Sequence, residues 1–179
     1  GSDWVGLKNF QFFFSSQDAW RVTRNTLGYN IIFISTVIIG SALIAILLYE
    51  IKNRKAVKAY QTILFFPYFL SFSVVAYVGY ALMNVDFGVL NGIARSIGLE
   101  EVFWYSEPKR WILMLPAIHF WKAAGYNVII FYAGMMAIDP SYYESAAIDG
   151  ASKLKMTTSI TLPMLKPIII ILTLVMVGR

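Results

Sequence analysis

The sequence predicts an all-α membrane protein, built as a bundle of several spanning helices. Of its 179 residues, 58% are hydrophobic and 14% are charged, whereas a soluble domain carries about 25% charged residues. Several apolar stretches are also long enough to cross a bilayer. The net charge of +5 is interpreted as Lys and Arg in membrane-flanking loops rather than as a nucleic-acid surface. The chain has no cysteine, which excludes a thiol nucleophile and a cysteine-based metal site.

The first predicted span covers residues 27–49, which contain no charged residue. A helix of this length extends about 35 Å, enough to cross the hydrocarbon core. Its Ile and Val residues would also suit a buried strand, but strands rarely exceed about ten residues. Length therefore favours a helix.

The second span is predicted at 61–85, with a kink near Phe66 because Pro67 follows it. The third is predicted at 111–138. The fourth apolar run, 168–179, reaches only about half of the roughly 20 residues that a spanning helix needs. We therefore expect a fragment with three complete spans and part of a fourth.

The connectors predict the orientation. The loop after Tyr49 has a single acidic residue, Glu50, among four basic ones, Lys52, Arg54, Lys55 and Lys58. Short loops rich in Lys and Arg lie on the cytoplasmic side, which places the segment 139–167 there too and an ordered connector, 84–110, outside. Residues 1–26 are predicted to be extracytoplasmic or interfacial because they are rich in aromatic residues, namely Trp4, Phe10, Phe12, Phe13, Phe14 and Trp20.

The segment 139–167 has clear helix signals. Asp139 and Pro140 suit a helix start, and Glu144 follows Ser141 at capping-box spacing, so a helix is predicted from Pro140 to a stop at Gly150. A second helix is predicted over 151–162, closed by Pro163. The segment also contains three small side chains that would let another protein approach the backbone closely, namely those of Ala146, Ala147 and Ala151. It could equally be a plain helical connector.

The run YYESAAIDGASKLKMTTSITLPMLKP resembles the EAA loop of binding-protein-dependent ABC importer permeases. The matching positions are Glu144, Ala146, Ala147, Asp149, Gly150, Ala151, Ile160, Leu162, Pro163, Leu165 and Pro167, with Ser145 in place of the commoner Ala. The segment VGLKNFQFFFSSQDAWRVTRNTLGYN is similar to that before the second span of LplB-type polysaccharide permeases. The resemblance covers nearly the whole chain and implies the type I importer permease fold.

That resemblance implies a six-span, maltose-permease-like subunit of the bacterial plasma membrane, carrying a carbohydrate. Its implied partners are a second permease, an extracytoplasmic solute-binding protein and a cytoplasmic ATPase dimer, which would bind ATP and Mg²⁺ while this chain holds no cofactor. The loop would seat in the ATPase, with Glu144 and Gly150 central among the coupling residues. The remaining implied coupling residues are Ala146, Ala147, Asp149, Ala151, Leu162 and Pro163.

The third predicted span carries the candidate substrate path. His119 and Lys122 lie three residues apart and so share a helix face, and ionisable residues inside a membrane often mark a functional site. Aromatic faces with polar groups at the rim suit a sugar, although the same residues also serve helix packing. The candidates are His119, Trp121, Lys122, Tyr126 and Asn127.

An intramembrane enzyme and an ion-coupled carrier are the two alternative function classes. The sequence has no phosphate-binding Gly-rich loop with Lys and Ser or Thr, and no His, Asp or Glu cluster at metal spacing. An intramembrane enzyme would need such a cluster, and an ion-coupled carrier would need charges or broken helices at mid-membrane. The residues therefore favour a transport subunit, without naming the sugar.

Overall fold

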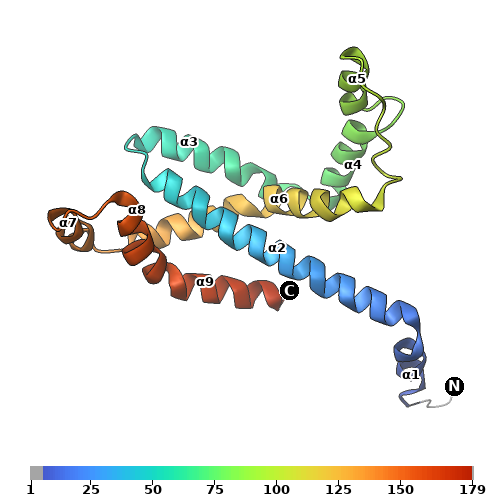
Figure 1. Cartoon of the computed structure of the whole chain (residues 1–179), viewed down its shortest axis with the longest axis horizontal. Coiled ribbons are helices and arrows are strands. Elements are labelled where there is room, and N and C mark those ends of the chain that lie inside the picture. The colour runs from blue at the N-terminus through green and yellow to red at the C-terminus, as the bar shows by residue number, and fades with distance from the viewer. Residues whose placement is uncertain (1–5, 179) are drawn as a thin grey trace.

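The computed structural model describes residues 6–178, and helices make up its regular structure, with no strand in that part of the chain (Figure 1). In chain order the α-helices are α1 (Lys8–Ser15), α2 (Gln17–Tyr49), α3 (Arg54–Phe65), α4 (Phe72–Met83), α5 (Val89–Ser96), α6 (Pro108–Met136), α7 (Pro140–Ile148), α8 (Lys153–Met156) and α9 (Leu162–Val177). A 3₁₀ turn, Phe66–Phe69, follows α3, and a π turn, Thr157–Thr161, joins α8 to α9. The predicted all-α class is confirmed.

The centre of the bundle is formed by α2, α6 and α9. In a bilayer such helices associate by close packing and by hydrogen bonds rather than by the hydrophobic effect. One hydrogen bond of this kind is buried, from Ser41 Oγ of α2 to the Ala124 carbonyl of α6 over 3.3 Å. The buried apolar cluster consists of Ile38, Ala42, Ala45, Leu48, Val128, Phe131, Met135, Leu165 and Leu172.

Two glycines of α6 allow other helices to approach closely. A Cβ at Gly125 would collide with the backbone carbonyl of Leu64 in α3, and one at Gly134 would collide with the Ile168 side chain of α9. Small residues at helix contacts are typical of membrane bundles, because they let the backbones come close together. The packing of α6 against α3 and α9 therefore depends on these two positions.

The second predicted span is broken rather than kinked. The helices on either side of the break, α3 and α4, form an angle of 97°. Pro67 is the second residue of the 3₁₀ turn, and Leu70 and Ser71 are extended. Ser71 then starts α4 by accepting a hydrogen bond from the N–H of Val74, over 3.2 Å. Pro67 marked the region correctly, but two extended residues and a new cap turn the chain far more sharply than a proline kink.

The predicted helix stop at Pro163 is wrong. The chain forms a continuous helix from Lys153 to Val177, which passes both Pro163 and Pro167. A proline ring in a helix meets the carbonyl four residues earlier, which for Pro163 is that of Ser159. That carbonyl lies in the π turn Thr157–Thr161, where the backbone is wider than in an α-helix. Residues 168–177 of the predicted fourth run, 168–179, thus belong to a helix that starts in the connector.

Two of the described helices are long and apolar enough to cross a membrane, namely Gln17–Tyr49 and Lys153–Val177, and the bent α3–α4 pair would make a third. The predicted third span, α6, is also long, at 29 residues. It is less apolar because His119, Lys122 and Asn127 lie along it. The first predicted span is thus part of a longer helix. The second is broken between α3 and α4, and the third carries polar side chains.

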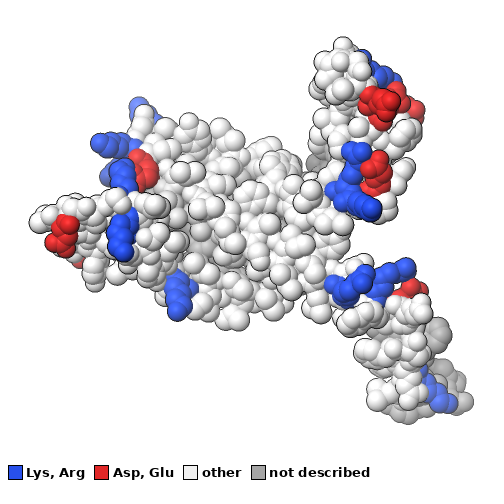
Figure 2. Space-filling model, in the orientation of Figure 1, with Lys and Arg blue, Asp and Glu red and all other residues white. Residues whose placement is uncertain are grey.

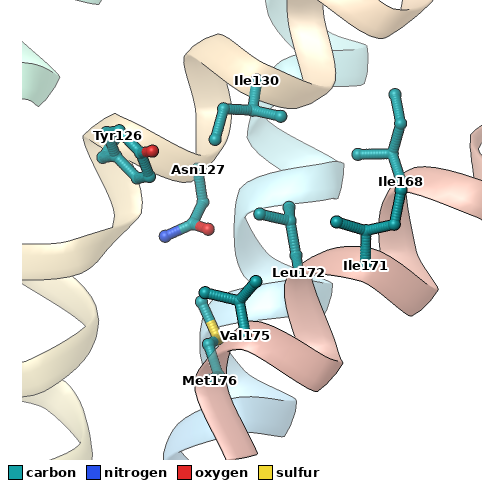
Figure 3. A pocket seen from close by; sticks show the side chains of 8 residues that line it. All are labelled: Tyr126, Asn127, Ile130, Ile168, Ile171, Leu172, Val175 and Met176. Atoms are coloured by element: carbon teal, nitrogen blue, oxygen red, sulfur yellow. The ribbon is translucent and has the colours of Figure 1, made fainter. Parts of the chain in front are cut away.

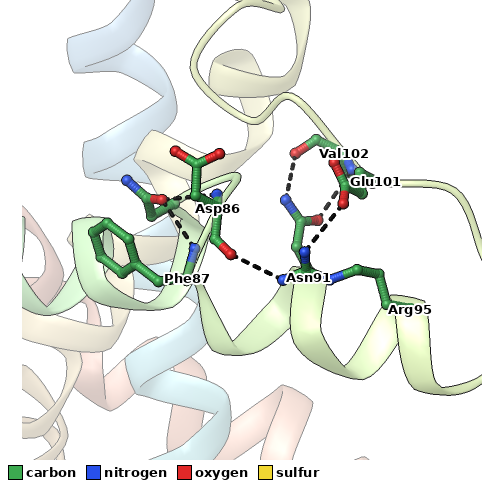
Figure 4. A network of polar contacts seen from close by, with 7 residues as sticks. Asp86, Phe87, Asn91, Arg95, Glu101 and Val102 are labelled. Carbon is green, nitrogen blue, oxygen red and sulfur yellow. Dashed lines mark hydrogen bonds and ion pairs between the residues drawn. The ribbon is translucent and has the colours of Figure 1, made fainter.

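The connector between α4 and α6 is ordered, as predicted, and is held by its own side chains (Figure 4). Asn91 of α5 is buried and exchanges two hydrogen bonds of 3.0 Å with the backbone of Val102. Arg95 donates to the Asp86 carbonyl over 3.0 Å and to the Glu101 carboxylate over 3.2 Å. These bonds fold the connector back onto α5.

Charged side chains gather at the two ends of the elongated molecule, with a broad uncharged band between them (Figure 2). One end carries the start of α3 together with α7 and α8, and the other carries α1, the start of α2 and the α4–α6 connector. Of the predicted interfacial aromatics, Phe10, Phe14 and Trp20 are exposed near this second end, whereas Trp4 and the side chains of Phe12 and Phe13 lie outside what the structure describes.

Candidate functional site

The segment between α6 and α9 begins with a capped helix, α7. The N–H of Ser141 donates to the Asp139 carboxylate over 2.9 Å, and this hydrogen bond lowers the pKa of Asp139. Pro140 occupies the first turn, where its missing N–H costs nothing. The predicted capping box is not formed, because Asp139 is the cap and Ser141 lies inside the helix, one turn before Glu144.

The end of α7 is fixed by Gly150. Its φ is +75°, a region that costs other residues about 1–2 kcal/mol. The N–H of Gly150 donates to the Ala147 carbonyl over 3.1 Å, and the N–H of Ala151 donates to the Ala146 carbonyl over 2.9 Å. This pair of bonds is a Schellman motif. The predicted helix end at Gly150 is confirmed.

The outer surface of α7 is open, and no residue of this helix is buried. Ile148, an apolar residue, is 87% exposed. In a connector that only faces water, a polar side chain would be expected at this position. The sequence-predicted coupling residues are divided between exposed ones, Glu144, Ala147, Asp149 and Gly150, and half-buried ones, Ala146 and Ala151. Leu162 and Pro163 lie apart from them, in the first turn of α9 beyond the π turn.

The inner side of this segment is tied to the spanning helices. Tyr143 of α7 shares a 2.9 Å hydrogen bond with the Thr161 hydroxyl, and its ring centroid lies 6.3 Å from that of Tyr49 at the end of α2. Lys153 of α8 forms an ion pair with Glu50, the residue after α2. α7 and α8 are thus attached to α2 and to the π turn.

The candidate substrate-path residues lie on different sides of α6. His119 stacks on Phe33 of α2 at 4.6 Å between centroids and lines a cavity of about 550 Å³ with residues of α4. Lys122 donates to the Tyr68 carbonyl over 3.2 Å, and its ammonium lies 4.8 Å from the centre of the Phe72 ring. Phe72 also lines the His119 cavity, so His119 and Lys122 meet at the start of α4, next to the break.

Tyr126 and Asn127 instead line a cavity of about 380 Å³ between α6 and α9 (Figure 3). Asn127 is buried and donates to the Ala123 carbonyl over 2.9 Å, while its side-chain oxygen has no partner among the described residues. Trp121 lines a third, apolar cavity with residues of α4 and α5. The five predicted residues therefore do not form one site. His119 and Lys122 lie near the start of α4, Tyr126 and Asn127 line the cavity beside α9, and Trp121 lines an apolar cavity. The ring of Tyr126 also stacks on Tyr68, with 5.0 Å between the centroids.

Comparison with known proteins identifies the family to which the chain belongs. The family described as "Binding-protein-dependent transport system inner membrane component" matches residues 38–179. The chain belongs to this family. It is therefore a multi-pass permease chain of the inner membrane, and the enzyme alternative is not supported because its relatives are transport permeases.

The permease chain is similar to the polygalacturonan/rhamnogalacturonan transport system permease protein YteP of Bacillus subtilis, with 33% identity over 180 residues, 99% of this chain and 56% of that protein. It is 30% identical over 177 residues to Protein LplB of the same organism, again covering 99% of this chain and 56% of LplB. The permease chain thus spans about half the length of these relatives. The predicted family is confirmed.

A solved structure is also similar, that of a bacterial alginate ABC transporter in complex with an alginate pentasaccharide-bound periplasmic protein. The TM-score is 0.90 at 32% identity, and the match covers 97% of this permease chain and 60% of that chain. The broken α3–α4 segment and the α7–α8 segment are therefore parts of a known permease fold.

Sequence reasoning missed the contacts that hold the α7–α8 segment of the permease chain in place. The sequence shows Glu50 only as the single acidic residue of a basic loop, and it gives no reason to single out Tyr143. Their partners, Lys153 and Thr161, lie 103 and 18 residues away in the chain, and no local pattern pairs them. One signal was available: Thr161 stands two residues before Pro163, where a helix that continues needs a local distortion.

Proposed function

We propose that this chain is part of the permease subunit of an ATP-driven importer that carries an oligosaccharide across the bacterial plasma membrane. The substrate class is supported by the relatives, which include a polygalacturonan/rhamnogalacturonan permease, and by the likeness to an alginate transporter structure. The observation that carries the proposal is this likeness along almost the whole chain, together with a helix, α7, whose outer face is uncovered.

The charge distribution supports an orientation. Around α2's end and α3 the chain carries Lys52, Arg54, Lys55 and Lys58 against Glu50, and short loops of this kind stay in the cytoplasm. The α7–α8 segment lies at the same end of the bundle (Figures 1 and 2). We therefore assign α7 and α8 to the cytoplasm, and α1 and the α4–α6 connector to the other side.

In this orientation α7 is the docking surface for a cytoplasmic ATPase dimer. A partner can shift a conformational equilibrium only through contacts that differ between two states, and α7 offers such contacts without unfolding any of the bundle. Glu144 supplies a charge, Ala147 permits close approach, and Gly150 fixes the helix end. ATP and Mg²⁺ are assigned to the ATPase, and the second permease and the extracytoplasmic solute-binding protein complete the importer.

The substrate path is assigned to the polar side chains of α6. A sugar needs flat apolar faces and hydrogen-bonding groups at their rim. The cavity at His119 is lined by several rings, including Phe33, Phe72 and Tyr80. The second cavity is bordered by Tyr126 and by Asn127, whose amide oxygen is buried and has no partner among the described residues. Lys122 joins the first cavity to the α3–α4 break. An acidic oligosaccharide would meet this ammonium.

Co-purification of the intact subunit in detergent tests the assembly. An ATPase and a second permease should accompany the subunit, and the complex in proteoliposomes should import labelled oligosaccharides from a panel of alginate, galacturonan and maltose chains. An isolated subunit that transports alone would overturn the proposal. Import of none of the three would reject the substrate class while leaving the assembly intact.

The orientation is tested by cysteine labelling, because the chain has no cysteine of its own. Ile148 of α7 and Phe103 of the other connector are both exposed, so single Ile148→Cys and Phe103→Cys variants are comparable. A membrane-impermeant maleimide added to intact cells should label Phe103→Cys and reach Ile148→Cys only after lysis. The reverse pattern would overturn the orientation.

A further inference from the structure

Tyr143 carries the inward contacts of α7. Its hydroxyl shares a hydrogen bond with Thr161, and its ring packs beside that of Tyr49. Its neighbour Tyr142 points the other way and is exposed. One helix therefore has a docking face on one side and a single polar aromatic anchor on the other.

The two partners of Tyr143 belong to two different spanning helices. Thr161 is buried and ends the π turn that precedes α9, and π turns inside α-helices are frequent at functional sites. Tyr49 is the last residue of α2. A displacement of Tyr143 therefore acts on the first turn of α9 and on the end of α2 together.

The space around this contact is small and is lined by both polar and apolar side chains. A cavity of about 60 Å³ lies between α2, α6, α7, α8 and the π turn, and it is lined by Tyr49, Glu50, Tyr143, Lys153 and Thr161, among others. Packed interfaces of this kind change between discrete arrangements rather than deforming continuously. The Glu50–Lys153 ion pair closes the outer side of the cavity, but its side chains are exposed, so it contributes little.

We propose that Tyr143 is a positioning residue for energy coupling: through Thr161 and Tyr49 it passes the displacement of α7 to α9 and α2. The covalent connection from α7 to α9 alone would leave this transfer loose, because residues 149–152 between them include Gly150 and form no helix. This inference rests on the proposed docking of an ATPase on α7.

The test measures movement in the assembled importer. Spin labels on introduced cysteines report these distances once any cysteines elsewhere in the importer have been replaced, because this part of the subunit has none. Two pairs share a reference at Leu113 of α6: Ile148–Leu113 follows α7, and Leu174–Leu113 follows α9. All three positions are exposed. Distances are compared with and without ATP plus vanadate, and ATP hydrolysis is measured in the same preparations.

The variants remove one hydroxyl each. Tyr143→Phe and Thr161→Val delete the hydrogen bond and keep the packing, and Thr161→Ser keeps the hydroxyl. Matched controls are Tyr60→Phe on the exposed surface of α3, which is not part of the docking helix, and Thr158→Val in the π turn, whose hydroxyl bonds only to carbonyls of its own helix.

In the parent and both controls we expect ATP plus vanadate to change both distances. In Tyr143→Phe and Thr161→Val the α7 distance should still change, the α9 change should fall by more than half, and the double variant should be no worse than either single variant. Thr161→Ser should behave as the parent. An α9 change of parental size in Tyr143→Phe overturns the inference alone. If neither distance changes in the parent and no ATPase co-purifies with it, the proposed function is overturned as well.

Discussion

The connectors at the two ends of the bundle are built from the same parts. α5 has 8 residues and α7 has 9. Gly98 follows the first helix at φ +76°, and Gly150 follows the second at φ +75°. In each, the N–H after the glycine returns to a carbonyl of the last turn, from Leu99 to Ala94 and from Ala151 to Ala146, both over 2.9 Å. Both helices therefore end in a Schellman motif.

The two connectors differ in where their other groups find partners. Around α5, Asn91 is buried, and Trp111 donates to the Trp104 carbonyl over 3.1 Å, so the connector is held from within. α7 has no buried residue, and Tyr143 attaches it to helices elsewhere in the chain. The same local design thus serves as a cap at one end and as an exposed surface tied to two spanning helices at the other.

The largest expected effect comes from Gly150→Pro. Proline cannot reach a φ of +75° and lacks the N–H that bonds to Ala147, so the end of α7 is lost. We expect the ATPase no longer to co-purify, while membrane insertion is unchanged. Gly98→Pro makes the same change at the other connector and should retain the ATPase. Equal loss in both variants would show that the glycines matter only for folding.

Charge reversal on α7 should have the next largest effect. A cleft that accepts the exposed Glu144 carboxylate presents cations to it, and a like-charge contact at an interface costs several kcal/mol. Glu144→Lys should therefore weaken ATPase binding at least about tenfold, as measured by titration of the purified ATPase, and abolish substrate-stimulated transport. Glu100→Lys, an exposed glutamate of the other connector, is the control. Normal uptake by Glu144→Lys would contradict the coupling role.

Removing the buried amide should loosen only the other connector. Asn91→Ala leaves the N–H and C=O of Val102 without partners, at a cost of about 1–3 kcal/mol for a buried group. Hydrogen exchange should rise over residues 97–107 and stay unchanged in α7, with the ATPase still bound. Protection that is unaltered in 97–107 would mean that the connector is held by other contacts.

The smallest expected effect depends on pH. The folded pKa of Asp139 is lowered by the Ser141 N–H, and that of Glu107 is lowered by its hydrogen bond to Arg110. A carboxyl group whose pKa is lower in the folded state than in the unfolded state stabilises the fold at a pH above its unfolded pKa. That contribution is lost as the pH falls through the folded pKa. The protection of amides in the first turns of α7 and α6 against hydrogen exchange, measured relative to the intrinsic exchange rate at each pH, should therefore fall in acid. Asp139→Asn should remove this dependence from α7 only.

Local signals explain which parts of the fold could be predicted. The first span follows from an uncharged stretch longer than any strand, and both ends of α7 follow from Asp139, Pro140 and Gly150, because caps are local. The proposed coupling role of α7 rests on the resemblance and not on local signals. In contrast, a proline shows that a helix is disturbed but not how the disturbance is resolved. Pro67 precedes a 97° break, whereas Pro163 is accommodated by a π turn.

Contacts between distant residues could not be predicted. The Lys153–Glu50 pair joins positions 103 residues apart, and the stacking of His119 on Phe33 depends on how α6 lies against α2. The candidate path residues were chosen by residue type along one helix. Only the packing of α4 and α9 around that helix decides what surrounds each of them.

The close contact between Gly125 and the Leu64 carbonyl also determines which sequence changes the chain can accept. A side chain at 125 would meet backbone, which cannot rotate aside, whereas Gly92 of α5 has open space around its Cα. Two glycines in helices thus stand at opposite extremes of tolerance. In a saturation mutagenesis library selected for growth on the transported carbohydrate, almost only glycine should survive at position 125, whereas most amino acids should be tolerated at position 92.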